Sequence, residues 1–213
     1  MIDQYLQPER GYRFSEDSLI LAHQAPACQT GLAADFGAGC GVVGIEALAC
    51  GRLAGLERLW LVEIDPRFRP SLKENLRRLK VQGSASLPKI GALWTDWRKL
   101  APQDLGGRLD LILANPPYFP IGSSGPMEAG RQRARHATYG GIDGLLTASK
   151  SLLRPGGRLI VSWPRSKLGE LTQKACALNF SVSKVHLPKR AKAGLTILEL
   201  ILTTRLEGGI QAA

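Results

Sequence analysis

Short, mostly apolar runs alternate along this chain with longer stretches that have helical spacing. The runs at 59–62 and Leu109–Ala114 have the composition of buried parallel strands. Val42–Ala49 and 67–80 instead carry apolar residues at the three- and four-residue intervals of amphipathic helices. This alternation of strand and helix predicts an α/β fold built on a largely parallel sheet.

The rest of the chain supplies further elements of the same kind. A first helix is expected to begin near Ser15, and another helix at 167–178. Further strands are expected at Lys89–Leu93, 158–163, 181–187 and 195–204, with a turn at 153–157. The last two strands are expected to pair as a hairpin-like edge.

The predicted architecture is an α/β sandwich. It has a mostly parallel seven-stranded sheet with one antiparallel strand and helices on both faces. We expect one domain over residues 1–213, in which residues 1–30 form an N-terminal cap segment and the first helix.

The composition suits one soluble domain. A chain of 213 residues with 44% hydrophobic content can bury one substantial core. No apolar run approaches the ~20 residues of a membrane span, and the N-terminus lacks a signal-peptide pattern. Paired metal-ligand spacing is absent among the four cysteines, which are Cys28, Cys40, Cys50 and Cys176. We therefore expect a cytoplasmic protein without a metal or membrane partner, and the oligomeric state stays open.

The charge of the chain is strongly positive. Lys and Arg number 28 and Asp and Glu 18, which gives +10 and a pI near 9.8. Residues 67–108 contain ten basic and three acidic residues, or 10 − 3 = +7, although a solvated helix face explains much of this stretch. The remaining clusters are Arg131, Arg133, Arg135 and His136, and Lys184, Lys189, Arg190 and Lys192. Such charge favours a polyanionic partner such as nucleic acid.

The four residues Asn115-Pro116-Pro117-Tyr118 directly follow the strand-like run Leu109–Ala114. The side-chain carbonyl of Asn115 and the backbone carbonyl of Pro116 can accept hydrogen bonds from a planar amino group. Such bonds favour a tetrahedral nitrogen as charge develops on it. Tyr118 offers a flat face on which a base can stack. An ordinary polar turn has the same composition, so the surroundings of the motif must decide its meaning.

A glycine loop precedes this motif in the chain. Asp35 follows the small-residue run 31–34 and leads into the helical pattern of Val42–Ala49. Between them lie three alternate glycines, Gly37, Gly39 and Gly41. A strand, a glycine loop and a helix in this order let the backbone approach a nucleotide closely.

The next strand ends at an acid. Glu63 lies 22 residues after Gly41 (63 − 41 = 22), near the spacing of an acid that binds ribose hydroxyls. A dinucleotide-dependent dehydrogenase would share this acid. The Gly-x-Gly-x-Gly spacing argues against that class, because a pyrophosphate cradle has Gly-x-Gly-x-x-Gly.

The glycine loop, the acid and the Asn-Pro-Pro-Tyr motif together resemble the class I S-adenosylmethionine-dependent methyltransferases. The resemblance implies that the predicted α/β sandwich is the Rossmann-like sandwich of the class I methyltransferases. Further segments narrow the resemblance: Gly11-Tyr12-Arg13-Phe14-Ser15 with Asp17, Val62-Glu63-Ile64-Asp65, and Arg133-Ala134-Arg135-His136. They look like the YfiC-like family, which includes the bacterial valine-tRNA adenine-N6 methyltransferases. The resemblance runs from about Gly11 to the strand at 195–204. Some family members carry a longer C-terminal region than this sequence, which puts the RNA substrate more in doubt than the reaction.

The resemblance implies S-adenosylmethionine as cofactor and assigns roles to matching positions. The implied cofactor-binding residues are Phe14, Asp17, Asp35, Gly37, Gly39, Gly41, Glu63, Ile64, Asp96, Trp97 and Asn115. The target amine would meet Asn115, Pro116, Pro117 and Tyr118. The candidate nucleic-acid residues are Arg13, Arg131, Arg133, Arg135, His136, Lys189, Arg190 and Lys192.

Some of these roles are specific. Phe14 and Asp17 would close over the methionine end of the cofactor, and Glu63 would hold the ribose. Asp96 would accept from the adenine amino group and Trp97 would contact the adenine, although a helix N-cap explains Asp96 equally.

The expected function is methyl transfer to an exocyclic amino group, foremost adenine N6 in tRNA. In-line displacement needs positioning and no metal or covalent intermediate. One alternative is a protein glutamine-N5 methyltransferase, an enzyme that usually carries an N-terminal helical domain. Another is a guanine-N2 rRNA methyltransferase. A DNA substrate is also left open. From a different class comes a catalytically silent RNA-binding protein on the same scaffold.

Overall fold

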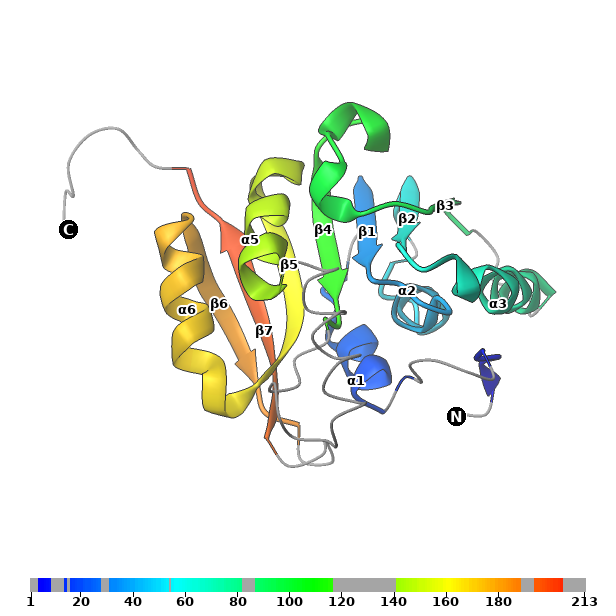
Figure 1. Cartoon of the computed structure of the whole chain (residues 1–213), viewed down its shortest axis with the longest axis horizontal. Coiled ribbons are helices and arrows are strands. Elements are labelled where there is room, and N and C mark those ends of the chain that lie inside the picture. The colour runs from blue at the N-terminus through cyan, green and yellow to red at the C-terminus, as the bar shows by residue number, and fades with distance from the viewer. Residues whose placement is uncertain are drawn as a thin grey trace.

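A seven-stranded sheet forms the centre of the computed structural model, which describes residues 4–8, 14, 16–27, 31–53, 55–81, 87–116, 141–188 and 194–204. The strand order is β3-β2-β1-β4-β5-β7-β6 (Figure 1). The strands are β1 (Leu32–Phe36), β2 (Arg58–Val62), β3 (Lys89–Leu93), β4 (Leu109–Ala114), β5 (Leu153–Pro164), β6 (Phe180–His186) and β7 (Leu195–Leu202). β7 is antiparallel to both β5 and β6, whereas the pairs among β1 to β5 are parallel. The predicted sheet, with its one antiparallel strand and hairpin-like edge, is confirmed.

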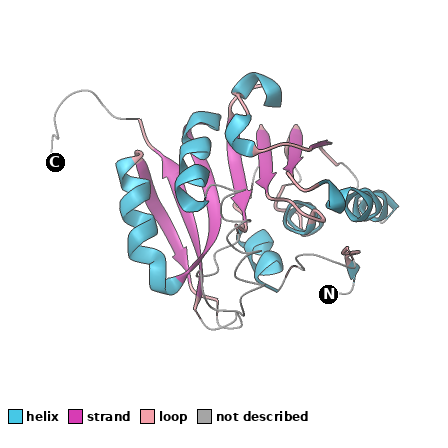
Figure 2. Cartoon of the chain, in the orientation of Figure 1, coloured by secondary structure: helices cyan, strands magenta, loops and turns pink. Residues whose placement is uncertain are grey.

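Helices cover both faces of this sheet (Figure 2). The α-helices are α1 (Glu16–Gln24), α2 (Val42–Ala49), α3 (Arg69–Val81), α5 (Gly141–Leu152) and α6 (Leu168–Ala177). Short 3₁₀ turns are η2 (Pro66–Phe68), η3 (Trp97–Lys99), η4 (Pro102–Leu105) and η5 (Arg165–Lys167). None of the helices in the described part of the chain is long and apolar enough to span a membrane.

Successive strand residues feed two separate hydrophobic cores. Ala33 and Leu111 face a core completed by residues of α1, α2 and α3. Their neighbours Ala34 and Ile112 face a second core, completed by residues of α5 and α6. Because side chains alternate along a strand, two buried faces explain why the strands read as continuous apolar runs.

Element boundaries follow the predictions closely, with three differences. The helix predicted at 67–80 begins at Arg69, because Asp65 caps the preceding turn η2. The turn predicted at 153–157 lies inside β5, where Leu109 pairs with Leu153 and Leu111 with Arg158, so the intervening residues bulge from the ladder. Helix α5 was not predicted.

Three strand ends meet at one edge of the sheet. β1 lies between β2 and β4, and its last residue Phe36 pairs with both Val62 and Ala114. The glycine loop, Glu63 and Asn115 each follow one of these ends. Ligands of open α/β sheets bind at this position, where connections leave β1 and β4 toward opposite directions of the strand order.

Candidate active site

The glycine loop after β1 has an alternating left-handed backbone. Gly37, Gly39 and Gly41 have φ values of 73°, 55° and 86°. A Cβ at Gly41 would lie 2.5 Å from Leu72 Cδ1 and 2.9 Å from Ile45 Cδ1. Both the left-handed φ and the close packing therefore require glycine at this position. The loop lies at the carboxyl ends of the strands, where a ligand would bind, and its Gly37 and Gly39 are half-buried.

Asp35 is a buried carboxyl group at the end of β1. Its side chain is 1% exposed, and its Oδ2 accepts from the Gly44 backbone N–H at 2.9 Å. Its Oδ1 has no hydrogen-bond partner among the residues that the structure describes. Burial raises the pKa of Asp35 to about 7, with a contribution from the charge of Glu63, while the Gly44 N–H opposes the rise. A contact of Asp35 with the cofactor stays a prediction.

Glu63 ties the end of β2 to the glycine loop. Its carboxylate is buried and accepts from the Gly39 N–H at 2.9 Å and from the Asp65 N–H at 2.8 Å. The backbone N–H groups of Gly37 and Ala38 also donate to the Val62 carbonyl, at 2.9 and 3.1 Å. The acid predicted to bind ribose thus lies beside the loop, and its ribose contact stays a prediction.

Asp96 caps a 3₁₀ turn, as its alternative interpretation predicted. Its side chain accepts from the Arg98 backbone N–H at 2.9 Å and from the Arg98 guanidinium at 2.6 Å. Burial alone would raise the pKa of Asp96, but these bonds lower it below its usual value. Asp65 and Arg67 form the same pair after β2, with a guanidinium distance of 2.5 Å. A contact of Asp96 with adenine stays a prediction.

Trp97 lies in the core beneath the loop. It is 3% exposed and stacks on Phe36, with ring centroids 5.6 Å apart and an interplanar angle of 4°. A Cβ at Gly37 would come within 3.4 Å of the Trp97 ring. Trp97 therefore supports the loop from below, and a direct contact with the cofactor stays a prediction. Ile64 follows Glu63 and is half-buried.

Two serines that the sequence interpretation missed hold the side chain of Asn115. Asn115 Nδ2 donates to Ser18 Oγ of α1 at 2.8 Å, and Asn115 Oδ1 accepts a short hydrogen bond from Ser162 Oγ of β5. Both serines are buried. The sequence could have pointed to Ser162, because it is a polar residue within an apolar, strand-like run. The amide of Asn115 is thus oriented from two sides, with Pro116 buried next to it.

The N-terminal candidates lie close by. Phe14 is buried and meets the Tyr5 ring edge-on at a centroid distance of 5.8 Å. Asp17 is buried in the first turn of α1, next to Ser18. Because Ser18 contacts Asn115, α1 brings Asp17 to the same edge of the sheet as the catalytic candidate.

The other candidate residues lie outside the described part of the chain. They are Arg13, Pro117, Tyr118, Arg131, Arg133, Arg135, His136, Lys189, Arg190 and Lys192, and Ser15 as a helix cap lies there too. Within the described part, no group of three or more His, Cys, Asp or Glu side chains could hold a metal ion.

A family model and curated relatives match this chain. Residues 20–121 match the family described as "Conserved hypothetical protein 95". A tRNA1(Val) (adenine(37)-N6)-methyltransferase from Shewanella loihica is 31% identical over 159 residues, which are 75% of this chain and 63% of that protein. A release factor glutamine methyltransferase from Moorella thermoacetica is 34% identical over 139 residues, or 62% of this chain and 45% of the relative. The matches thus span less than two thirds of these relatives' own length, and the predicted family resemblance is confirmed.

Solved methyltransferase structures share the fold. A methyltransferase from Pyrococcus furiosus superposes with a TM-score of 0.64 at 17% identity, covering 94% of this chain and 89% of that chain. An S-adenosylmethionine-dependent O-methyltransferase from Thermotoga maritima gives 0.59 at 14% identity, with 94% and 69% covered. The predicted Rossmann-like methyltransferase sandwich is confirmed.

Proposed function

We propose that this chain, a relative of the bacterial tRNA1(Val) adenine-N6 methyltransferases with the fold of class I methyltransferases, is an S-adenosylmethionine-dependent N-methyltransferase. Its target is an exocyclic amino group, foremost adenine N6 in tRNA. The observation that carries the proposal is the orientation of Asn115 by Ser18 and Ser162, at the strand end next to the glycine loop.

This orientation gives Asn115 an acceptor for an amine. Its Nδ2 donates to Ser18, so its Oδ1 is the end that can accept a further N–H. A carbonyl oxygen has two lone pairs, and the Ser162 hydroxyl uses one of them. An N–H of the target amine would use the other, and the Pro116 carbonyl would accept the second N–H. Accepting both hydrogens favours the tetrahedral nitrogen of the transition state over the planar ground state.

The residues around the glycine loop fit S-adenosylmethionine. This cofactor would supply a methyl group already activated on a sulfonium. The glycines of the loop would let a ligand approach its backbone closely, and Asp35 would offer a buried carboxyl oxygen to a cationic group. Glu63 would accept from the ribose hydroxyls, and Phe14 and Asp17 would enclose the methionine end. The roles of Asp96 and Trp97 at the adenine belong to the same proposal.

The substrate class follows from charge and relatives. A net charge of +10 favours RNA over a neutral protein substrate. The Shewanella loihica relative is named for adenine 37 of a valine tRNA. We infer that the basic residues at 131–136 and 189–192, with Arg13, contact the RNA backbone and that Tyr118 stacks on the target base. Residues 1–213 would work as one domain, in the cytoplasm where tRNA is modified.

A protein glutamine-N5 methyltransferase is the second candidate. The Moorella thermoacetica relative has that name and is 34% identical over the matched residues. A side-chain amide presents the same planar NH₂ group to Asn115 as adenine does. The charge of the chain places this candidate behind RNA.

One labelling experiment separates these candidates. Purified protein is incubated with tritiated S-adenosylmethionine and, in separate reactions, total RNA or total protein from a strain lacking the gene. The RNA is then digested to nucleosides. Label in N6-methyladenosine from the tRNA fraction is expected. Asn115→Ala should abolish the label, whereas Gln173→Ala, which removes an exposed amide from α6, should retain it. Label only in a protein fraction would support glutamine, and cofactor binding without label anywhere would indicate a silent scaffold.

A further inference from the structure

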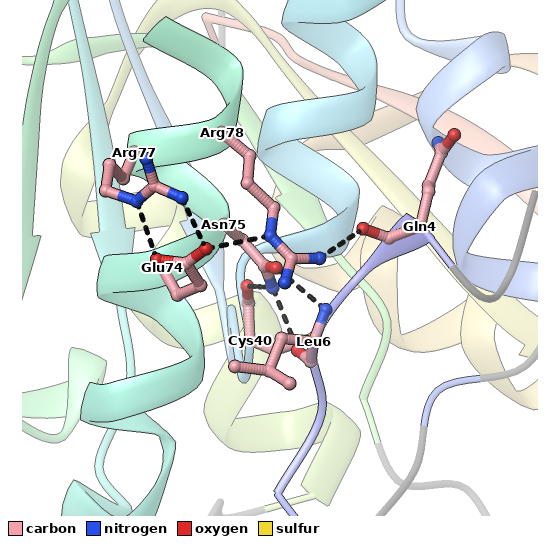
Figure 3. Close-up of polar contacts among 7 residues, drawn as sticks. All are labelled: Gln4, Leu6, Cys40, Glu74, Asn75, Arg77 and Arg78. Carbon is pink, nitrogen blue, oxygen red and sulfur yellow. Dashed lines mark hydrogen bonds and ion pairs between the residues drawn. The ribbon is translucent and has the colours of Figure 1, made fainter. Parts of the chain in front are cut away.

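We propose that Asn75 of α3 is a positioning residue for the cofactor loop and couples this loop to the N-terminal segment at residues 4–8. Figure 3 shows Asn75 between Cys40 of the loop and Leu6 of that segment. The inference rests on the proposed function, because it assigns Asn75 an effect on S-adenosylmethionine binding.

The Asn75 amide is buried and uses all of its polar atoms. Nδ2 donates to the Cys40 carbonyl at 2.9 Å and to the Leu6 carbonyl at 2.9 Å. Oδ1 accepts from the Leu6 backbone N–H at 2.8 Å. The side chain is 2% exposed, so an unpaired group here would carry a desolvation penalty. One amide therefore joins α3, the glycine loop and the N-terminal segment.

The contact with Cys40 holds a peptide plane of the loop. The Cys40 carbonyl and the Gly41 N–H belong to the same planar peptide. The Gly41 N–H donates to the Ala38 carbonyl at 2.7 Å, while Asn75 donates to the opposite edge of that plane. Leu72, one helical turn before Asn75, lies against Gly41. Helix α3 thus contacts the loop in two ways: Asn75 donates a hydrogen bond to it, and Leu72 packs against it.

The N-terminal segment has a second contact with α3 and also contacts α2. The Arg78 guanidinium donates to the Gln4 carbonyl at 3.1 Å, and Tyr5 Oη donates to Glu46 of α2 at 2.5 Å (Figure 3 shows the Arg78 contact). Tyr5 also packs against Phe14, which we place at the methionine end of the cofactor. Releasing the segment would break two of the three hydrogen bonds of Asn75, next to the loop. Order in the segment and order in the loop therefore favour each other, and any ligand that orders the loop should stabilise the segment.

The coupling predicts a reciprocal effect that two measurements detect. Saturating S-adenosylmethionine should slow hydrogen exchange at the Leu6 amide of the wild-type chain. In calorimetric titrations, Asn75→Leu should weaken S-adenosylmethionine binding by about tenfold, the value of one buried hydrogen bond. Asn75→Asp keeps the acceptor for Leu6 and loses the donor to Cys40, so its affinity should fall as well. Arg78→Ala is the matched comparison: it loses the Gln4 contact but leaves Asn75 bonded to Cys40, so its affinity should fall by less than that of Asn75→Leu.

The outcomes separate this inference from the proposed function. A wild-type chain that binds no S-adenosylmethionine overturns both. Two results would overturn the coupling and leave the methyltransferase proposal intact. One is an unchanged affinity for S-adenosylmethionine in the Asn75 variants. The other is a hydrogen-exchange rate at the wild-type Leu6 amide that does not change when the cofactor binds. The exchange measurement needs no variant, so it decides the matter even if Asn75→Leu does not fold.

Discussion

Gly41→Ala tests the close packing of the glycine loop on α3. Gly41 has a φ of 86°, and an alanine Cβ there would lie 2.5 Å from Leu72 Cδ1 and 2.9 Å from Ile45 Cδ1. The left-handed backbone costs an L-residue about 1–2 kcal/mol. Displacing two packed methyl groups adds about 1–3 kcal/mol. The variant should lose roughly 2–5 kcal/mol of unfolding free energy.

Gly51→Ala isolates the packing part of this loss. Gly51 also has a left-handed φ, 76°, but a Cβ there would meet no atom within 4 Å. Its variant should lose only the backbone share, about 1–2 kcal/mol. In denaturant melts, the unfolding free energy of Gly41→Ala should therefore lie about 1–3 kcal/mol below that of Gly51→Ala. This difference corresponds to a thermal midpoint lower on the order of 2–12 °C. Only Gly41→Ala should also weaken S-adenosylmethionine binding.

Equal losses in the two variants would refute the packing argument. A double variant adds a second check, because Leu72→Ala removes the methyl group that collides with a Cβ at Gly41. The combined loss in Gly41→Ala with Leu72→Ala should be smaller than the sum of the single losses. If the losses of unfolding free energy are strictly additive, Leu72 moves aside for the new Cβ without an energetic penalty.

Three further predictions concern the site. The pKa of Asp35 in the folded chain, about 7, lies above the ordinary value of about 4 for an aspartate, so the folded chain holds an extra proton between these pH values. The unfolding free energy should therefore fall as pH rises from about 4 to 7, by at most about 4 kcal/mol. Denaturant melts of Asp35→Asn should not show this pH dependence. The affinity for S-adenosylmethionine should rise over the same pH range in the wild type and not in Asp35→Asn. Ser162→Ala should lower kcat about tenfold with little change in KM, and Ser162→Thr should restore part of it; an unchanged kcat would contradict the orienting role. RNA methylation should weaken steeply with added salt in initial-rate assays, and a flat response would argue against a polyanionic substrate.

Central strands such as β4 were predictable because they are short apolar runs buried on two faces. Lys89–Leu93 and Leu109–Ala114 have the boundaries that the pattern predicted. Helix α5 escaped prediction because Gly141 and Gly144 begin it, and glycine disfavours helix by about 1 kcal/mol per residue. Packing of Ile142 and Leu145 in the second core overrides that preference.

The partners of the site residues were less predictable than the residues themselves. Asn115 and Glu63 follow strand ends in recognisable motifs, which sequence spacing reveals. Ser18 and Asn75 belong to helices whose pattern marks only a buried face. Their hydrogen bonds to Asn115 and Cys40 exist because the fold brings remote segments together, and no local spacing encodes that.

The hydrogen bonds of Asn115 also bear on the order of events in folding. They span 97 positions to Ser18 and 47 positions to Ser162. Contacts of such long sequence separation form slowly, because closing the long intervening loop costs conformational entropy before the contact stabilises it. During synthesis Asn115 leaves the ribosome before Ser162 has been made. A nascent chain would therefore complete its glycine loop, and with it the means to hold a cofactor, before β5 joins the sheet and orients the amide that receives the target amine.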